Sequence, residues 1–123
     1  MLPQENRLRQ DRDFKRVHRQ GRFAGFGFLS LKKVPNQLPD SRLAFLVGLK
    51  VSKKAVLRNQ VKRRLREATR KHLRELKSGF DVVVFVRPEI AEKSYQDIEE
   101  CLMRLFAKAQ LIKSNNGEKS ENY

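Results

Sequence analysis

Residues 49–77 have the sequence LKVSKKAVLRNQVKRRLREATRKHLRELK, which predicts one basic helix over residues 52–77. The side chains of its less polar face recur at steps of three and four, as on an amphipathic α-helix. They are Leu57, Val61, Leu65, Ala68, His72 and Leu76. Residues 50–77 also contain twelve Lys or Arg and only two acidic residues, with cations four apart on a neighbouring face. Like charges at that spacing cost roughly 0.2–0.5 kcal/mol per pair. The pattern therefore favours a polyanionic partner over the alternative, a merely solvated helix face.

The charge of the whole chain supports this prediction. The 123 residues carry a net charge of +14, and residues 1–79 hold 22 basic and 6 acidic side chains. Such a field indicates nucleic acid or an anionic membrane as partner. A membrane is disfavoured because no apolar run approaches the ~18–20 residues of a span and the basic helix lacks aromatic anchors. The lone Cys101 cannot form an internal disulfide, which suits a reducing cytoplasm.

The N-terminal part predicts an arm and a short helix. Residues 1–10 are polar and basic, which predicts an extended arm. A helix follows from Asp11, as its cap, to a stop at Gly21. Phe14, Val17 and His18 share its apolar face. His18 has two interpretations that remain open: a half-buried side chain beside Phe14, or a ring that stacks on a base.

Alternation over residues 23–33 predicts a strand with Ala24, Phe26, Phe28, Ser30 and Lys32 on one face. A proline-rich turn follows, and a second strand over residues 42–49 returns beside the first as a hairpin. Aromatic rings on such a face either stack single-stranded bases or pack against a helix. The sequence leaves both possibilities open.

The C-terminal part predicts a buried strand and a helix. Residues 80–87 form a continuous apolar run, typical of a strand buried on both faces in a parallel pair. Ser94 and Asp97 match a capping box. The helix that they open is expected to bury Ile98, Leu102, Leu105, Phe106, Ala109 and Ile112. Residues 113–123 predict a disordered tail, which leaves a single α+β domain over residues 1–112.

Catalytic apparatus is not evident in the sequence. The two histidines and one cysteine lack the spacing of a zinc site, and no glycine loop has a phosphate-binding setting. The carboxylates do not cluster as a two-metal nuclease would need. We therefore expect no catalytic residues and no metal site in the chain, and a binding function.

Residues 55–70, AVLRNQVKRRLREATR, resemble the signature helix of the bacterial ribonuclease P protein subunit. The segments Asn6-Arg7-Leu8, Asp13-Phe14 and Val17-His18 resemble the first helix of that family, and GLKVSKK, residues 48–54, its lead into the signature helix. The resemblance covers residues 6–112. It implies a two-layer αβββαβα sandwich with a small mixed sheet, whose βαβ crossover is left-handed, whereas the general rule would predict the opposite hand.

The resemblance also implies a function. A member would be the auxiliary subunit of ribonuclease P, a cytoplasmic endoribonuclease whose catalytic RNA removes the 5′ leader of precursor tRNA. The protein would bind the catalytic RNA and precursor tRNA, with no obligate protein partner. It would hold no cofactor itself, because the Mg²⁺ ions bind to the RNA subunit.

Two sets of site residues follow from the resemblance. The RNA-binding set of the signature helix is Lys53, Lys54, Arg58, Asn59, Lys62, Arg63 and Arg66. The leader cleft set is Phe14, His18, Phe28, Ser30 and Lys32. The chain departs from the family at Gln60, where a second arginine is usual. It also lacks a few residues before Ala55, so we expect the helix to start near Ser52, with Lys53 and Lys54 in its first turn.

Two other functions compete with this interpretation. A structural RNA-binding protein, such as a ribosomal protein, would use the same helix but would not affect cleavage. A nuclease acting without RNA is disfavoured because the carboxylate cluster is missing.

Overall fold

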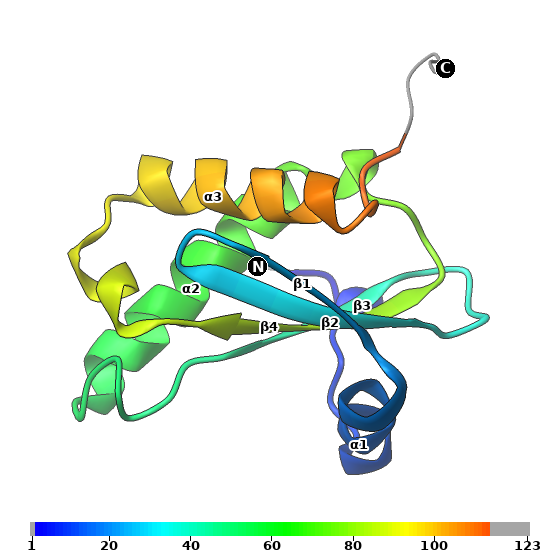
Figure 1. The fold of residues 1–123 in the computed structure, drawn as a ribbon, viewed down its shortest axis with the longest axis horizontal. Helices are drawn as coiled ribbons and strands as arrows, with labels where there is room; N and C mark the ends of the chain where they lie inside the picture. The colour runs from blue at the N-terminus through cyan, green and yellow to red at the C-terminus, as the bar shows by residue number, and fades with distance from the viewer. Residues whose placement is uncertain (1, 114–123) are drawn as a thin grey trace.

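The computed structural model describes residues 2–113 and has the element order αβββαβα. Its main elements are α1 (Asp11–Gln20), β1 (Arg22–Phe26), β2 (Leu29–Pro35), β3 (Arg42–Leu46), α2 (Ala55–Lys71), β4 (Phe80–Val86) and α3 (Tyr95–Lys108). Short 3-10 segments occupy Gln4–Asn6, Leu73–Glu75 and Pro88–Glu92. Helices α2 and α3 cover one face of the sheet, and α1 crosses the other face (Figure 1). The predicted α+β class is confirmed.

The sheet has the strand order β1-β2-β4-β3, which differs from the predicted hairpin. The stretch predicted as one strand over residues 23–33 is two antiparallel strands, with Phe26 opposite Leu29 and a two-residue turn between them. Gly27 in that turn has a φ of 59°, a conformation that glycine adopts without steric cost. The predicted pairing of the second strand was also wrong, because β3 is parallel to β4 and β2 is antiparallel to β4. β3 ends at Leu46, three residues earlier than predicted.

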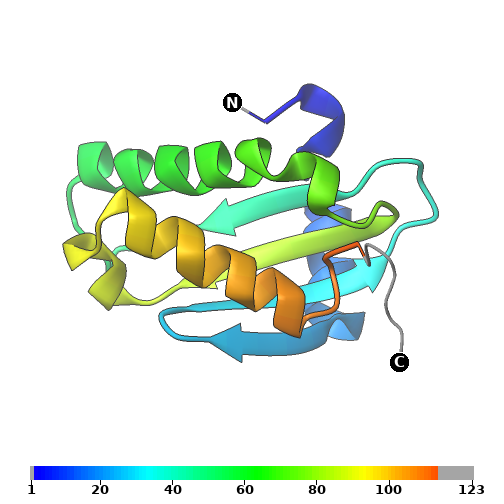
Figure 2. The ribbon, with the colours of Figure 1, turned by 90° about the horizontal axis from the view of Figure 1, so that it is seen from above.

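Strand β4 is central and buried on both faces, as its continuous apolar sequence predicts. The connection from β3 through α2 to the parallel strand β4 is left-handed (Figure 2). Seen from the helical side with both strands pointing up, the chain leaves β3, descends through α2 in front and enters β4 on the left. This is the hand that the family resemblance implies and the opposite of the general rule.

Helix α2 is shorter than the predicted span of residues 52–77. It begins at Ala55, with Lys54 as its N-cap, and ends at Lys71. The hydroxyl of Ser52 accepts a hydrogen bond from the Lys54 backbone N–H at 3.1 Å, which holds a turn before the helix. Lys53 and Lys54 therefore precede the first turn, contrary to the prediction. Leu57, predicted on the buried face, is 43% exposed.

The main core lies between the sheet and the layer of α2 and α3. Helix α2 contributes Val61, Leu65 and Ala68, all buried. Helix α3 is opened by the predicted capping box, in which Ser94 and Asp97 bond reciprocally at 3.1 and 3.2 Å. A smaller cluster on the other face packs α1 and Leu8 against the sheet; its buried members are Leu8, Val17, Val34 and Val83.

Both ends of the described segment, residues 2–113, pack against the fold more than the sequence indicates. The predicted N-terminal arm is packed: Leu2 and Leu8 are buried, and the Leu8 N–H donates to the Leu43 carbonyl at 3.0 Å along β3. At the C-terminal end, Lys113 donates its backbone N–H to the Glu75 carbonyl at 2.7 Å, so it does not begin a disordered tail. The rest of the predicted tail, residues 114–123, lies outside the described residues.

Candidate nucleic-acid interface

Helix α2 presents four cations and Asn59 beside its buried face. Asn59 and Arg63 are exposed, and Arg58, Lys62 and Arg66 lie half-buried along the border with the core. The Arg58 guanidinium donates to the Ser52 carbonyl at 2.9 Å, which ties the turn before the helix to its first turn. Five of the seven predicted residues thus lie on α2, where they can contact phosphates along an RNA backbone, whereas Lys53 and Lys54 precede the helix.

The acidic partners of α2 gather at its C-terminal end. Glu67 pairs with Arg70 at 2.6 Å, and this hydrogen bond lowers the pKa of Glu67 to about 2. Lys71 lies 3.3 Å from Glu99 of α3. His72, predicted on the apolar face, instead bonds Glu75 and Glu99 at 2.8 and 2.6 Å. The neutralised charges are therefore at the end of α2 that docks on α3.

A hollow of about 380 Å³ joins α2 to the N-terminal segment. Lys62 and Arg66 line it from α2, and Arg7 and Arg9 line it from the segment before α1. Its floor is formed by Leu2, Leu8, Phe14 and residues 43–46. Four cations from two distant parts of the sequence thus surround one depression.

A second hollow of about 440 Å³, here called the α1 groove, runs between α1 and the sheet. Apolar and basic side chains line it together: Phe14, Lys15, Val17, His18, Arg19, Leu46, Val83 and Phe85. Phe14 is half-buried and His18 is exposed. Rings beside cations can stack bases while the cations contact phosphates.

The two hollows form one continuous surface, because Phe14 and Leu46 line both. The surface leads from His18, along α1 and over the edge of β3, to Lys62 and Arg66 on α2. The structure therefore places Lys62 and Arg66 of the signature-helix set on the same surface as Phe14 and His18 of the leader cleft set.

The other three predicted cleft residues, Phe28, Ser30 and Lys32, do not line the α1 groove. Phe28 is wrongly placed by the sequence: it is buried in the main core, with the Lys93 ammonium 5.7 Å from its ring. Ser30 pairs with Phe85 and so lies on the α1 face, but neither it nor Lys32 lines the α1 groove. The Lys32 ammonium instead donates to the His18 carbonyl at 3.0 Å, at the end of α1. There it complements the negative end of the helix dipole.

Sequence reasoning missed Leu46 and Phe85 as groove residues. Both lie in apolar strands and face α1, since Leu46 is opposite Phe85 in the parallel pair and Phe85 follows Val83 by two residues. Alternation along residues 81–86 could have indicated this face, but the run is apolar throughout and hides the period. Lys15 and Arg19 could have been predicted as groove residues, because each directly follows Phe14 or His18 in α1.

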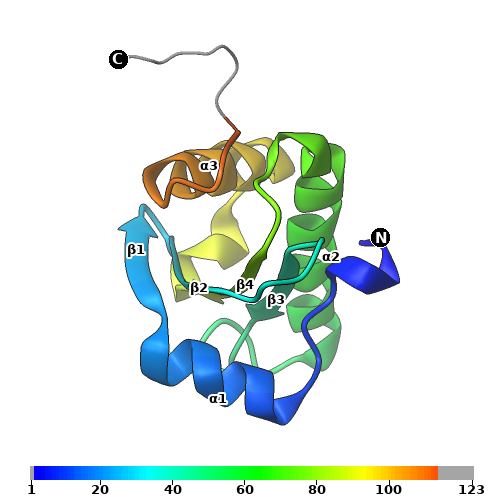
Figure 3. The ribbon, with the colours of Figure 1, turned by 90° about the vertical axis from the view of Figure 1, so that its right-hand side faces the viewer.

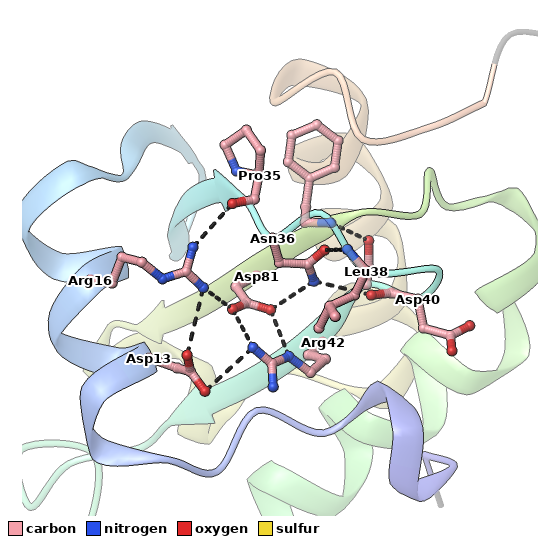
Figure 4. Close-up of polar contacts among 10 residues, drawn as sticks. Asp13, Arg16, Pro35, Asn36, Leu38, Asp40, Arg42 and Asp81 are labelled. Carbon is pink, nitrogen blue, oxygen red and sulfur yellow. Dashed lines mark hydrogen bonds and ion pairs between the residues drawn. The ribbon is translucent and has the colours of Figure 1, made fainter.

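A buried polar cluster sets the position of α1 against the sheet (Figure 4). Asp81 of β4 is fully buried and bonds Arg16 of α1, Arg42 of β3 and Asn36. Asp13 of α1 joins the cluster at 3.3 Å from Arg42. Hydrogen bonding to Asp81 raises the pKa of Arg42. One wall of the α1 groove is therefore anchored by charge-assisted hydrogen bonds.

Two further properties concern residues 2–113 alone. Within them, no group of three or more His, Cys, Asp or Glu side chains is arranged to hold a metal ion. Nor does this part of the chain include a helix long and apolar enough to cross a membrane.

Fold, charge and surface define a small basic α+β protein whose cations and rings converge on one continuous surface. The protein-family model described as Ribonuclease P matches residues 2–110, and the chain belongs to this family. It is 39% identical to the ribonuclease P protein component of Pseudanabaena sp. (strain PCC 6903), over 94% of this chain and 100% of the relative. It is 33% identical to the component of Alkaliphilus metalliredigens, over 90% and 99% of the two chains.

Solved structures agree with this assignment. The RNase P protein from Thermotoga maritima superposes with a TM-score of 0.74 at 31% identity, covering 80% of this chain and 93% of that one. The Staphylococcus aureus protein superposes with a TM-score of 0.80, covering 88% and 98%. Its 24% identity supports the shared fold only.

Proposed function

We propose that this chain is the protein subunit of ribonuclease P and assists a catalytic RNA in removing the 5′ leader of precursor tRNA. The α2 face contacts the catalytic RNA, and the α1 groove holds the single-stranded leader. The RNA subunit, with its own Mg²⁺, performs the hydrolysis, so the chain contributes no catalytic residue and no cofactor. The chain binds both the catalytic RNA and precursor tRNA in the cytoplasm.

The observation that carries the proposal is the continuity of the surface through Phe14 and Leu46. A leader emerging from a duplex needs a path that starts at a phosphate-binding surface and continues past stacking rings. The α2 cations and the α1 groove supply these in sequence. Neutralised phosphates on both RNAs also lower the demand for Mg²⁺, because counterions otherwise have to screen the approach of the two RNAs.

The test is cleavage of a precursor tRNA by the cognate catalytic RNA at low Mg²⁺, with and without the protein. Two substrates are compared, one with a leader of several nucleotides and one trimmed to a single nucleotide. We expect the protein to restore cleavage of both and to tighten binding of the long-leader substrate only. A protein that binds the RNA without changing cleavage or leader dependence would instead be a structural RNA binder.

Variants then test the groove itself. Phe14→Ala and His18→Ala should each weaken long-leader binding by roughly fivefold or more, the loss of about one stacked base. Binding of the trimmed substrate should change little. Gln96→Ala, at an exposed position on α3, is the matched control and should behave as the parent. Equal effects on both substrates would place the two side chains outside leader recognition.

A further inference from the structure

Within residues 2–113, no further strand pairs with the outer side of β1, which forms the edge of the sheet opposite α2 (Figure 3). The other edge strand, β3, is covered in part by the N-terminal segment, which bonds along it at Leu43. At the β1 edge, Phe23 is 64% exposed, an unusual position for a large aromatic side chain. Its ring lies against Gly25, where an added Cβ would be 3.4 Å from two ring atoms. One ring surface is thus supported by backbone.

Two adjoining hollows follow this edge, with volumes of about 500 and 200 Å³. Both are lined by Phe23, Ala24 and Lys108. The larger adds Arg87 and Phe26, and the smaller adds Arg22 and Lys33. Among the described residues, neither lining includes a carboxylate, so the edge combines aromatic rings with positive charge.

The edge is poorly suited to pairing with another strand. Lys108 of α3 donates to the Gly25 carbonyl at 2.8 Å, so this outward backbone group is already bonded. A lysine across a short edge strand is a common device against strand addition. A second copy of the chain would also bring another net charge of +14 to the same place. Charge complementarity therefore favours a polyanion with flat apolar groups, which describes single-stranded RNA.

We propose that the β1 edge is a second RNA-binding site, at which Phe23 stacks on a base while Arg22, Arg87 and Lys108 contact phosphates. The site is separate from the α1 groove, because none of these four side chains lines that groove or the adjoining hollow at α2. Because α2 packs over the edge strand β3 and Phe23 lies on the opposite edge strand β1, the chain can hold two RNA segments on opposite sides.

The absence of tryptophan from the sequence allows a local test. Phe23→Trp places a single tryptophan at the proposed site, excited selectively over the two tyrosines, and a short single-stranded oligouridylate serves as the probe. We expect saturable quenching of the emission. An oligomer of abasic sugar phosphates of the same length should quench little, because it offers charge without bases. Leu38→Trp, 43% exposed in the loop before β3, is the control and should show little quenching with either probe.

Variants separate stacking from charge. In the Phe23→Trp background, Arg22→Gln should reduce the slope of log K against log salt by about 0.7, as expected for one lost phosphate contact on a single strand. In the same background, Arg63→Gln on α2 should leave the affinity reported by the fluorophore at the β1 edge essentially unchanged. Binding of labelled oligouridylate, which needs no tryptophan at position 23, should be roughly fivefold weaker for Phe23→Ala than for the parent chain.

Several outcomes would overturn the proposal. Equal quenching by the abasic oligomer would remove the stacking role, and no quenching by either probe would remove the site. Self-association in sedimentation that Phe23→Ala abolishes would assign the edge to a second copy of the chain. Because no catalytic RNA is present, failure here leaves the proposed role in leader removal untouched, and the cleavage assay tests that role independently.

Discussion

Arg42 and Asp81 lie opposite each other on the parallel strands β3 and β4 and form a bidentate ion pair. Arg42 Nε donates to one carboxylate oxygen at 2.9 Å, and a terminal nitrogen donates to the other at 2.7 Å. Asp81 is fully buried, so Arg42, Arg16 and Asn36 replace the water that the carboxylate would otherwise bind. The cluster thereby joins α1 to strands β3 and β4 of the sheet (Figure 4).

Arg42→Ala should therefore destabilise the protein strongly. Removing one partner leaves a buried charge only partly compensated by Arg16, which costs about 3 kcal/mol or more. Urea denaturation measures this difference in the free energy of unfolding. Glu100→Ala, which breaks the exposed pair with Arg104 at 3.1 Å, is the control and should cost less than about 1 kcal/mol. A similar small loss in both variants would mean that the Asp81 cluster does not stabilise the fold.

Stability should fall as the pH rises past 6.5, the usual pKa of histidine. Hydrogen bonds to Glu75 and Glu99 raise the pKa of His72 above its usual 6.5. The folded state therefore binds this proton more tightly than the unfolded state, so the stabilisation is complete below the usual pKa and is lost as the pH rises through the folded pKa. Urea denaturation from mildly acidic to mildly alkaline pH should show the fall.

His72→Gln should flatten that pH dependence, and His18→Gln, at the other histidine of the chain, should retain it. The chosen range lies above the usual carboxylate pKa of 4.5, so protonation of Glu99 does not interfere. A parental slope in His72→Gln would assign the pH dependence to other groups.

Gly27→Ala should destabilise the turn between β1 and β2. Gly27 has a φ of 59°, and an added Cβ would lie 3.0 Å from the Cys101 sulfur. A left-handed alanine alone costs roughly 1–2 kcal/mol. Gly48→Ala is the matched control, because nothing lies within 4 Å of a Cβ there. Thermal unfolding should show a lower Tm for the first variant and little change for the second; equal Tm values would contradict the strained turn.

Arg63 and Arg70 should differ in their contribution to RNA binding. Arg63 lies exposed on the α2 face, whereas Arg70 is paired with Glu67 at 2.6 Å. Arg63→Gln should lower the slope of log K against log salt for the catalytic RNA by about 0.7–0.9. Arg70→Gln should lower it less, because its charge is already partly neutralised. Binding titrations at several salt concentrations measure both slopes, and equal slopes would mean that the pairing has no effect.

The sequence predicted the elements whose signals are local. The capping box of Ser94 and Asp97, the apolar face of α3 and the cations of α2 all depend on residues a few positions apart. The family resemblance added the order αβββαβα and the left-handed crossover. Periodicity alone failed at residues 23–33, because a two-residue turn preserves the alternation that a single strand would show.

Which residues meet was decided by the tertiary structure. Burial of Leu2 and Leu8 follows from bonding along β3, and burial of Phe28 follows from the turn that directs it towards α3. The α1 groove likewise needs Leu46 and Phe85, whose shared face depends on the register of β3 with β4. By itself, the sequence determined the helices, the positive charge and the family, because these depend on residue type and short spacing. Strand pairing and the shape of the binding surface were decided only by the folded chain, because they depend on contacts between residues as far apart as 39, 65 and 75 positions.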